Sequence, residues 1–343
     1  MSKVLVTGGT GYIGSHTVVE LINEGFEVVI VDNLSNSNVE VLNGIEKITG
    51  VRPAFENIDC VDYVAMDNMM DKYGKIDAII HFAASKAVGE SVEKPLLYYR
   101  NNLVSLINLL QLMPVHKIKN FVFSSSCTVY GQPDILPVTE GAPIKPALSP
   151  YGNTKQIGEE IIRDTIYANP TSYQSIVLRY FNPIGAHASA EIGELPNGVP
   201  NNLLPFVTQT AIGLRKQLQV FGNDYDTPDG SCIRDYIHVV DLAKAHVIAV
   251  KRMLDGKSGD SLETFNLGTG RGLSVLEIIK TFEEVNQVKV PYKIVSRREG
   301  DIEKVWADPT YANEVLGWKA METVEETLRS AWAWELNLAN RKN

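Results

Sequence analysis

The sequence predicts a doubly wound α/β fold, a parallel sheet covered by helices on both faces, with a smaller α/β lobe toward the C-terminus. Short runs rich in β-branched residues alternate with longer segments of helical periodicity from residue 3 onward. The short runs are apolar at both alternating positions, which is typical of parallel strands buried on both faces. Alternation of such strands with helices favours an α/β domain.

The expected elements follow one another in a regular order. Strands are expected at residues 3–7, 26–32, 75–84, 119–126 and 175–181, with helices at 12–23, 96–113 and 157–166. After Phe181 the segment 182–202 is rich in Gly, Pro, Ala and Asn and predicts a loop. Beyond it we expect helices near 203–216, 241–253 and 274–285 and strands near 218–222, 264–268 and 292–298.

Composition and charge limit the classes of function. The chain has 343 residues, of which 44% are hydrophobic and 21% charged, and a formal net charge of −9. This balance disfavours binding to nucleic acid or to an anionic membrane surface. Cys60, Cys127 and Cys232 are far apart in sequence and form no metal-binding spacing. Low cysteine usage, no secretory leader pattern and no apolar run of about 20 residues predict a cytoplasmic protein without a metal.

A glycine loop joins the first expected strand to the first expected helix. Gly8, Gly11 and Gly14 in "TGGTGYIG" allow the backbone to approach a pyrophosphate at the helix N-terminus. Asp32 ends the second strand, 18 residues beyond Gly14. A carboxylate there accepts hydrogen bonds from a ribose 2′-hydroxyl and repels a 2′-phosphate. The pattern therefore predicts a Rossmann-type domain that binds NAD rather than NADP.

Ser126, Tyr151 and Lys155 form the candidate catalytic group. Tyr151 and Lys155 are four residues apart, so they share one face of a helix that starts near Pro150. A free tyrosine titrates near ~10, but a lysine charge and a positive nicotinamide ring both favour the phenolate. Ser126 ends a strand, where ligands bind in open α/β sheets. A Tyr–Lys pair is also common on helix surfaces, so this interpretation depends on the glycine loop upstream.

Six motifs carry a resemblance to a known family. "TGGTGYIG", "HFAASKAVGES", "FVFSSSCTVYG", "SPYGNTK", "RYFNPIGAH" and "RDYIHVVDLA" are similar to the extended short-chain dehydrogenase/reductase family. Several of them resemble its nucleotide-sugar epimerases in particular. The resemblance implies reversible, NAD-dependent inversion at C4 of UDP-galactose and UDP-glucose through a 4-keto intermediate. It also implies that Tyr151 takes the O4 proton and that NAD is held throughout.

The resemblance implies a set of site residues and a division of the chain. Its catalytic positions are Ser126, Tyr151 and Lys155. Its cofactor positions are Gly8, Gly11, Tyr12, Ile13, Gly14, Asp32, Asn33, Asp59, Cys60, Phe82, Ala83, Lys86, Asn101, Ser124, Tyr151, Lys155, Tyr180, Phe181 and Pro183. Its substrate positions are Ser126, Asn182, Asn202, Leu203, Phe221, Arg234, Tyr236, Arg298, Asp301 and Val305. Residues 1–181 would form the NAD domain and 182–343 mainly the UDP-sugar lobe, with some segments returning to the first.

Position 305 departs from the pattern of many bacterial members of the family. They carry a tyrosine four residues after the acid of "REGD", where this chain has Val305. In the family that residue helps bound the sugar pocket. Because a smaller side chain leaves room near C2, we expect UDP-N-acetylhexosamines to be accepted as well.

Two helical segments carry surplus apolar surface. Residues 96–113 are apolar nearly all round, and 153–168 include a stripe at Ile157, Ile161, Ile162 and Ile166. A helix that covers one sheet face needs only one apolar stripe. The surplus, together with the resemblance, predicts a homodimer through these helices; the alternative is that both are core helices.

Three alternatives remain at this point. A nucleotide-sugar 4,6-dehydratase shares the glycine loop and the Tyr–Lys pair, but it requires a carboxyl group beside Ser126, where this chain has Cys127 and Thr128. A UDP-hexuronate-modifying enzyme of the same family is not distinguished by the sequence. A non-catalytic NAD sensor could use the same fold, although it has no need of a proton-transfer group.

Overall fold

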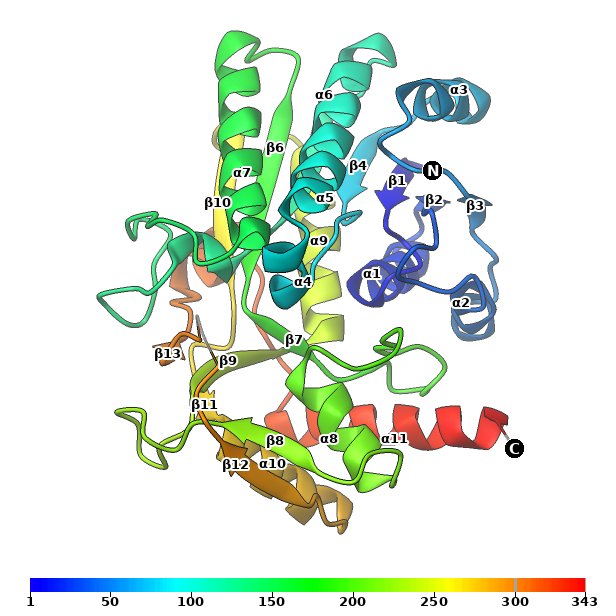
Figure 1. The fold of residues 1–343 in the computed structure, drawn as a ribbon. Helices are drawn as coiled ribbons and strands as arrows, with labels where there is room; N and C mark the ends of the chain where they lie inside the picture. The colour runs from blue at the N-terminus through cyan, green and yellow to red at the C-terminus, as the bar shows by residue number, and fades with distance from the viewer. Residues whose placement is uncertain (299–300, 343) are drawn as a thin grey trace.

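The computed structural model describes residues 1–298 and 301–342 and shows two lobes (Figure 1). Within these residues the larger lobe is built on a seven-stranded sheet in which every pairing is parallel. Its strands in spatial order are β10 (Leu262–Leu267), β6 (Gln174–Tyr180), β5 (Asn120–Ser126), β4 (Ala78–His81), β1 (Lys3–Thr7), β2 (Glu27–Val31) and β3 (Ala54–Glu56). The order reverses direction at β1 and β4, so the carboxyl ends of these strands border a ligand crevice.

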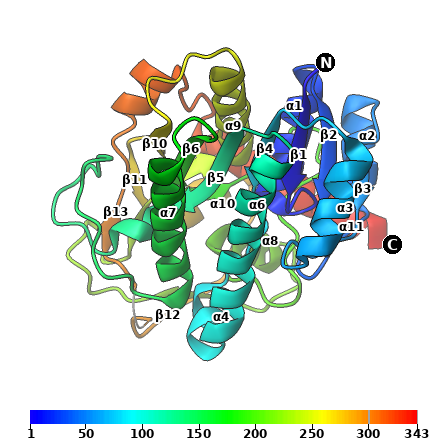
Figure 2. The same ribbon diagram turned by 90° about the horizontal axis from the view of Figure 1, so that it is seen from above.

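Helices cover both faces of the sheet, as the apolar runs predicted (Figure 2). One face packs on α1 (Tyr12–Asn23), α2 (Val41–Thr49) and α9 (Val239–Leu254), and the other on α3 (Tyr63–Tyr73), α6 (Ser105–Val115) and α7 (Pro150–Ala168). Alternate residues of one strand enter the two cores: Val4 and Val6 join the first and Leu5 the second. This alternation explains why the strands are apolar at every position.

The segment expected as one helix over 96–113 is divided into three parts. It comprises α5 (Pro95–Tyr99), a π-helical turn η1 (Arg100–Val104) and α6, after a short helix α4 (Val88–Glu93). In the π-helical turn the buried Asn102 donates to the Ser85 carbonyl (3.0 Å) and to Thr154 Oγ1 (2.9 Å). Such turns are often found at functional sites, and this one ties the loop after β4 to the helix that carries Tyr151.

The smaller lobe is formed mainly by the C-terminal part of the chain. In its sheets β12 (Tyr292–Val295) pairs with β8 (Leu218–Phe221), while β9 (Ile233–His238) pairs with β7 (Asn182–Ile184), β11 (Gly272–Ser274) and β13 (Lys304–Val305). Its helices are α8 (Leu203–Ala211), α10 (Val275–Asn286) and α11 (Val324–Lys342), and η3 (Ala312–Leu316) packs at the edge of the larger lobe. β7 lies inside the segment predicted as a loop, so that prediction was wrong for residues 182–184.

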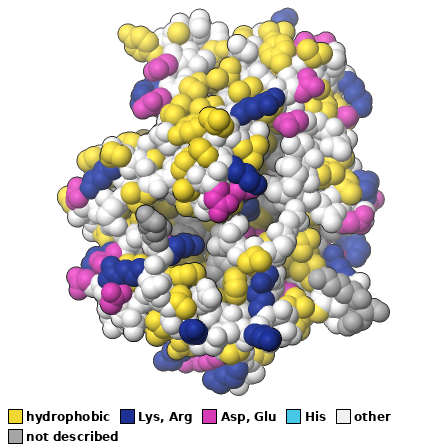
Figure 3. Space-filling model, in the orientation of Figure 1, with side chains coloured by type: hydrophobic (Ala, Val, Ile, Leu, Met, Phe, Trp, Pro, Cys, Tyr) yellow, Lys and Arg dark blue, Asp and Glu magenta, His cyan; other side chains and the backbone are white. Residues whose placement is uncertain are grey.

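Acidic and basic side chains are interspersed over the face seen in Figure 3 rather than gathered into an area of one sign. Among the described residues, no helix combines the length and the apolar character that crossing a membrane requires.

Candidate functional site

The glycine loop lies at the carboxyl end of β1, against the loop that follows β4. Gly8 has a φ of +71°, and a Cβ atom there would lie 2.7 Å from the Ala83 nitrogen. A Cβ on Gly14 would lie 2.2 Å from the Gly8 carbonyl oxygen. No side chain caps α1, whose N-cap residue is Gly11. The first turn of α1 therefore offers its N–H groups to an anion, with its positive dipole end toward the same point.

Asp32 is fixed at the carboxyl end of β2 by donors from the neighbouring loops. Its Oδ2 accepts from the Thr10 N–H (3.2 Å), and its Oδ1 accepts from the Leu34 N–H (2.9 Å) and the Ser37 hydroxyl (2.9 Å). The residue is 7% exposed. A carboxylate held in this way beside the glycine loop suits a ribose hydroxyl and disfavours a 2′-phosphate. The glycine loop and Asp32 therefore fit NAD.

Asn33, Asp59 and Cys60 lie together at the β2–β3 end of the crevice. Asn33 Nδ2 donates to Asp59 Oδ2 (3.1 Å). Cys60 is buried, and burial raises the pKa of its thiol, so the sulfur stays neutral. That these residues flank the adenine of the cofactor stays a prediction from the resemblance.

The loop after β4 supplies the middle of the expected cofactor site. The Phe82 ring packs 4.6 Å from the His246 ring, which comes from α9. Asn101 Nδ2 donates to Ser85 Oγ (3.2 Å). Lys86 is exposed, and its charge lowers the pKa of the Glu194 carboxyl group in the opposite lobe. Ile13 is partly buried against the core beneath α1.

Ser126, Tyr151 and Lys155 come together where β5 ends and α7 begins. Ser149 caps α7 by accepting from the Gly152 N–H (3.1 Å), which sets the start of the helix one residue before Tyr151. The Ser126 hydroxyl lies near the Tyr151 phenol and lowers its pKa. Lys155 Nζ lies 5.9 Å from the centroid of the Tyr151 ring. The structure thus brings together the serine, phenol and ammonium that the sequence predicted.

Burial changes the proton affinity of both titrating groups. Burial lowers the pKa of Lys155 to about 8, and the Glu159 carboxylate opposes that shift. The ammonium keeps most of its charge at pH 7. Burial also raises the pKa of Tyr151 well above its usual range, more than the neighbouring Ser126 hydroxyl lowers it. In the chain alone the phenol is therefore neutral, and ionising it requires positive charge beyond that of Lys155.

The carboxyl end of β6 closes the site on the other side of β5. The Tyr180 hydroxyl hydrogen bonds with Ser124 Oγ (2.5 Å), and Lys155 Nζ donates to the Ser124 carbonyl (2.6 Å). The chain then passes through the buried Phe181 into β7, where Pro183 pairs in register with Ile237. The side chains of Ser124 and Tyr180 therefore position each other beside Lys155.

The predicted substrate residues of the smaller lobe form a cationic group around one acid. Asp301 Oδ1 accepts from Arg298 Nη2 (2.8 Å) and lies 3.6 Å from Arg234 Nη2. The Arg298 guanidinium lies 5.6 Å from the centroid of the Phe221 ring. Two guanidinium groups beside an aromatic wall suit a diphosphate attached to a flat base.

The remaining substrate positions lie on strands and turns around this group. Asn182 pairs in register with the buried Tyr236, one strand from Arg234. Val305 pairs in register with Arg234 and is only 2% exposed, packed in a cluster that includes Phe181 and Cys127. Val305 thus forms an apolar wall between the arginines and the end of β5.

Asn202 and Leu203 begin helix α8. Asn202 is the N-cap residue, yet its side chain makes no cap hydrogen bond. Instead its Nδ2 donates to Glu194 Oε1 (2.5 Å).

The sequence prediction did not include two features of the site. Thr128 Oγ1 is buried and has no hydrogen-bond partner among the described residues, two positions after Ser126; its place directly after "SSSC" was the available signal. Glu159 lies one turn beyond Lys155 on α7 and pairs with Arg179 of β6, with Arg179 Nη2 2.6 Å from Glu159 Oε2. No sequence motif indicates this pair, because its members come from different elements.

Comparison with known proteins identifies the family. A family model described as GDP-mannose 4,6 dehydratase matches residues 5–331. The UDP-glucose 4-epimerase of Dictyostelium discoideum is 50% identical to this chain over 97% of the chain and 95% of its own length. That of Bacillus subtilis is also 50% identical, over 98% of the chain and 98% of its own length. The chain belongs to the UDP-glucose 4-epimerase family. Its membership agrees with the absence of a carboxyl group at Cys127 and Thr128, the positions where a dehydratase requires one.

Two solved structures of UDP-glucose 4-epimerases have nearly the same fold as this member. The enzyme of Stenotrophomonas maltophila, with bound NAD and formylated UDP-arabinopyranose, gives a TM-score of 0.95 at 47% identity and covers 99% of this chain and 100% of its own. The enzyme of Bifidobacterium longum, in complex with NAD+ and UDP, gives a TM-score of 0.94 at 46% identity and covers 99% of this chain and 99% of its own. The extended short-chain dehydrogenase/reductase fold predicted from the motifs is confirmed.

Proposed function

We propose that the chain interconverts UDP-galactose and UDP-glucose by NAD-dependent inversion at C4 through a 4-keto intermediate. The observation that carries the proposal is the convergence of Ser126, Tyr151 and Lys155 beside a glycine loop with Asp32. Relatives that are 50% identical over nearly the whole chain are named UDP-glucose 4-epimerases. Residues 1–181 would hold the cofactor and residues 182–343 mainly the UDP-sugar.

The residues of the chain account for the proton transfer and for the hold on the substrate. When bound, NAD supplies reversible oxidation of the sugar at C4. Tyr151 Oη accepts the O4 proton and later returns it, while the Ser126 hydroxyl holds O4 through the alcohol and ketone stages. Lys155 supplies positive charge 5.9 Å from the phenol ring and is positioned by the Ser124 carbonyl. For inversion, the ketone must present its other face before the proton returns.

The direct test is conversion of UDP-galactose to UDP-glucose by the purified protein without added NAD. Conversion is expected, because a cofactor that is oxidised and restored in each cycle need not leave. A product that has lost water would support the 4,6-dehydratase alternative. An absence of any conversion, with NAD bound, would support the sensor alternative and contradict the proposal.

Val305 leads to a prediction about the range of substrates. A relative 35% identical to this chain, from Campylobacter jejuni, is named UDP-Glc/GlcNAc 4-epimerase. We expect this chain to epimerise UDP-N-acetylglucosamine, and we expect Val305→Tyr to abolish that activity while conserving the reaction of UDP-galactose. The added ring would enlarge the buried side chain that stands in register with Arg234 and packs in the cluster of Phe181. Lack of reaction of the wild type with UDP-N-acetylglucosamine, while UDP-galactose reacts, would contradict the prediction.

We also propose a homodimer through the helices of residues 96–113 and 153–168. Support comes from the first segment, where Leu96 is 81% exposed, Leu97 41% and Ile107 38%. In the second segment Ile162 and Ile166 are buried in the core, as the alternative for that helix expected. A solution mass of twice that of one chain is expected by analytical ultracentrifugation, and Ile107→Lys should reduce it. Val51→Lys is the matched control, since Val51 is 49% exposed and follows helix α2, on the opposite face of the sheet. The cytoplasmic location stays a prediction.

A further inference from the structure

The loop between β7 and α8 contains an acidic residue that faces both expected binding sites. Glu194 accepts a hydrogen bond from Asn202, an expected substrate residue. The charge of Lys86 lowers the pKa of this carboxyl group, and the Glu194 carboxylate in turn raises the pKa of the Tyr12 phenol. Lys86 and Tyr12 are expected cofactor residues, so Glu194 lies at the junction of the two sites.

The backbone of this loop is anchored to α11, which limits where the Glu194 side chain can point. Trp334 Nε1 donates to the Glu194 carbonyl (2.9 Å). Gly193 packs directly on the same indole, since a Cβ there would lie 2.5 Å from Trp334 Cδ1. On the other side Tyr12 Oη donates to the Gly185 carbonyl (2.6 Å). The loop is therefore held between the first turn of α1 and helix α11.

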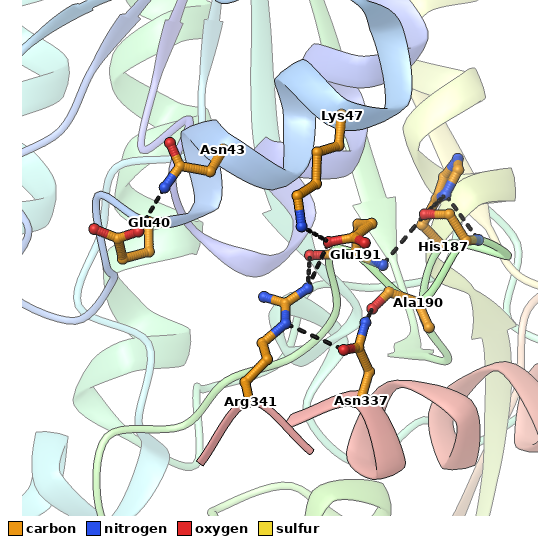
Figure 4. A network of polar contacts seen from close by, with 9 residues as sticks. Glu40, Asn43, Lys47, His187, Ala190, Glu191, Asn337 and Arg341 are labelled. Atoms are coloured by element: carbon orange, nitrogen blue, oxygen red, sulfur yellow. Dashed lines mark hydrogen bonds and ion pairs between the residues drawn. The ribbon is translucent and has the colours of Figure 1, made fainter. Parts of the chain in front are cut away.

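The outer part of the same loop is fastened separately, by Glu191 (Figure 4). Glu191 Oε2 lies 3.1 Å from Lys47 Nζ of α2 and 2.6 Å from Arg341 Nη2 of α11. Asn337 of α11 also donates to the Ala190 carbonyl (2.5 Å). Glu191 thus contributes to docking of the loop but does not touch Asn202, which makes it a control for the role of Glu194.

The bond between Glu194 and Asn202 has a consequence for helix α8. Asparagine at the N-cap position normally caps its own helix by accepting from the N–H groups of the first turn. Here the side chain is turned toward Glu194, and α8 has no side-chain cap. The N–H groups of Leu203 and Leu204, with the positive end of the helix dipole, are thereby left open to an anionic ligand, whereas Pro205 has no N–H.

We propose that Glu194 is a positioning residue that holds Asn202 away from the α8 N-terminus and so keeps that terminus open for the diphosphate of the UDP-sugar. This inference rests on the proposed function, because it assumes that Asn202 and Leu203 contact the substrate. Burial raises the pKa of Glu194, and the positive charge of Lys86 opposes that shift.

The test compares binding and turnover in Glu194→Ala, Asn202→Ala and the double variant. In Glu194→Ala the released Asn202 caps α8 and competes with the diphosphate. We expect KM for UDP-galactose and Kd for UDP to rise about tenfold, the typical effect of losing a hydrogen bond to a charged group. The turnover number should change less than about twofold. Glu194→Gln should recover part of the affinity, because its amide oxygen still accepts from Asn202.

The double variant separates positioning from a general structural role. If Glu194 acts through Asn202, Glu194→Ala adds no further rise in KM when Asn202 is already alanine. Additive effects, or an unchanged KM in Glu194→Ala, would overturn the inference. Glu191→Ala is the control on the same loop and should leave KM unchanged. Titration of each variant with UDP by calorimetry measures binding without turnover and therefore tests this inference. Failure of the wild type to epimerise UDP-galactose would instead refute the proposed function.

Discussion

Replacing Tyr151 by phenylalanine is expected to lower the turnover number about 10²–10⁴-fold, the usual effect of losing a general acid–base group. The phenol lies near the Ser126 hydroxyl, which lowers its pKa, and beside the Lys155 ammonium. Phenylalanine fills the same volume, so the fold and the NAD content should be conserved. The measurement is the rate of UDP-galactose conversion, with NAD content read by absorbance after denaturation and folding by thermal melting.

A second tyrosine on the same helix provides the control. Tyr167 is 89% exposed near the end of α7, so Tyr167→Phe changes the same atoms without touching the site. Its turnover should equal that of the wild type. Full turnover in Tyr151→Phe would show that another group accepts the O4 proton, and equal losses in both variants would show that the effect is not local.

The proton affinity of Tyr151 explains how the reaction depends on a complete complex. In the chain alone, burial raises the pKa of the phenol well above its usual range. Lys155 retains most of its charge at pH 7, because its pKa is about 8, yet that charge does not outweigh burial. A bound oxidised nicotinamide would supply further positive charge, so we expect Tyr151 to gain basicity when the cofactor is present.

The sequence predicted the parts of the site that depend on local geometry. Gly8 and Gly14 follow from the spacing of a strand, a tight turn and a helix, and Tyr151 and Lys155 follow from helical periodicity. Ser126 was placed at the end of a strand, and the structure has that strand end at the same residue. In each case the determining contacts lie within a few residues along the chain.

Contacts between distant residues were not predictable from such patterns. The bond from Asn202 to Glu194 depends on how the loop of residues 185–202 is anchored to α11, and α11 itself was not expected. The π-helical turn at Arg100–Val104 interrupts a segment whose composition reads as one continuous helix. These features depend on packing against other elements, which single-sequence periodicity does not contain.

The ion pair between Glu159 and Arg179 is the clearest such contact, and it leads to the largest expected effect on stability. The two side chains are 13% and 10% exposed and are joined at two points, with Arg179 Nε 3.0 Å from Glu159 Oε1 and Nη2 2.6 Å from Oε2. Ser125 also donates to Glu159 (2.5 Å), and Arg179 donates to the Tyr130 hydroxyl (2.8 Å). The pair therefore connects α7 with β5 and β6 directly beneath the catalytic residues.

Arg179→Met is expected to lower the free energy of unfolding by about 3–5 kcal/mol, because it leaves the Glu159 carboxylate buried without its partner. The measurement is urea denaturation at constant cofactor content. Replacing both residues by methionine should recover most of the loss, since an apolar pair of similar volume leaves no buried charge. Lys94→Met breaks the exposed pair with Glu90, whose side chains are 59% and 41% exposed, and should have little effect. Equal losses in Arg179→Met and Lys94→Met would show that burial of the Glu159 charge is not what makes the pair necessary.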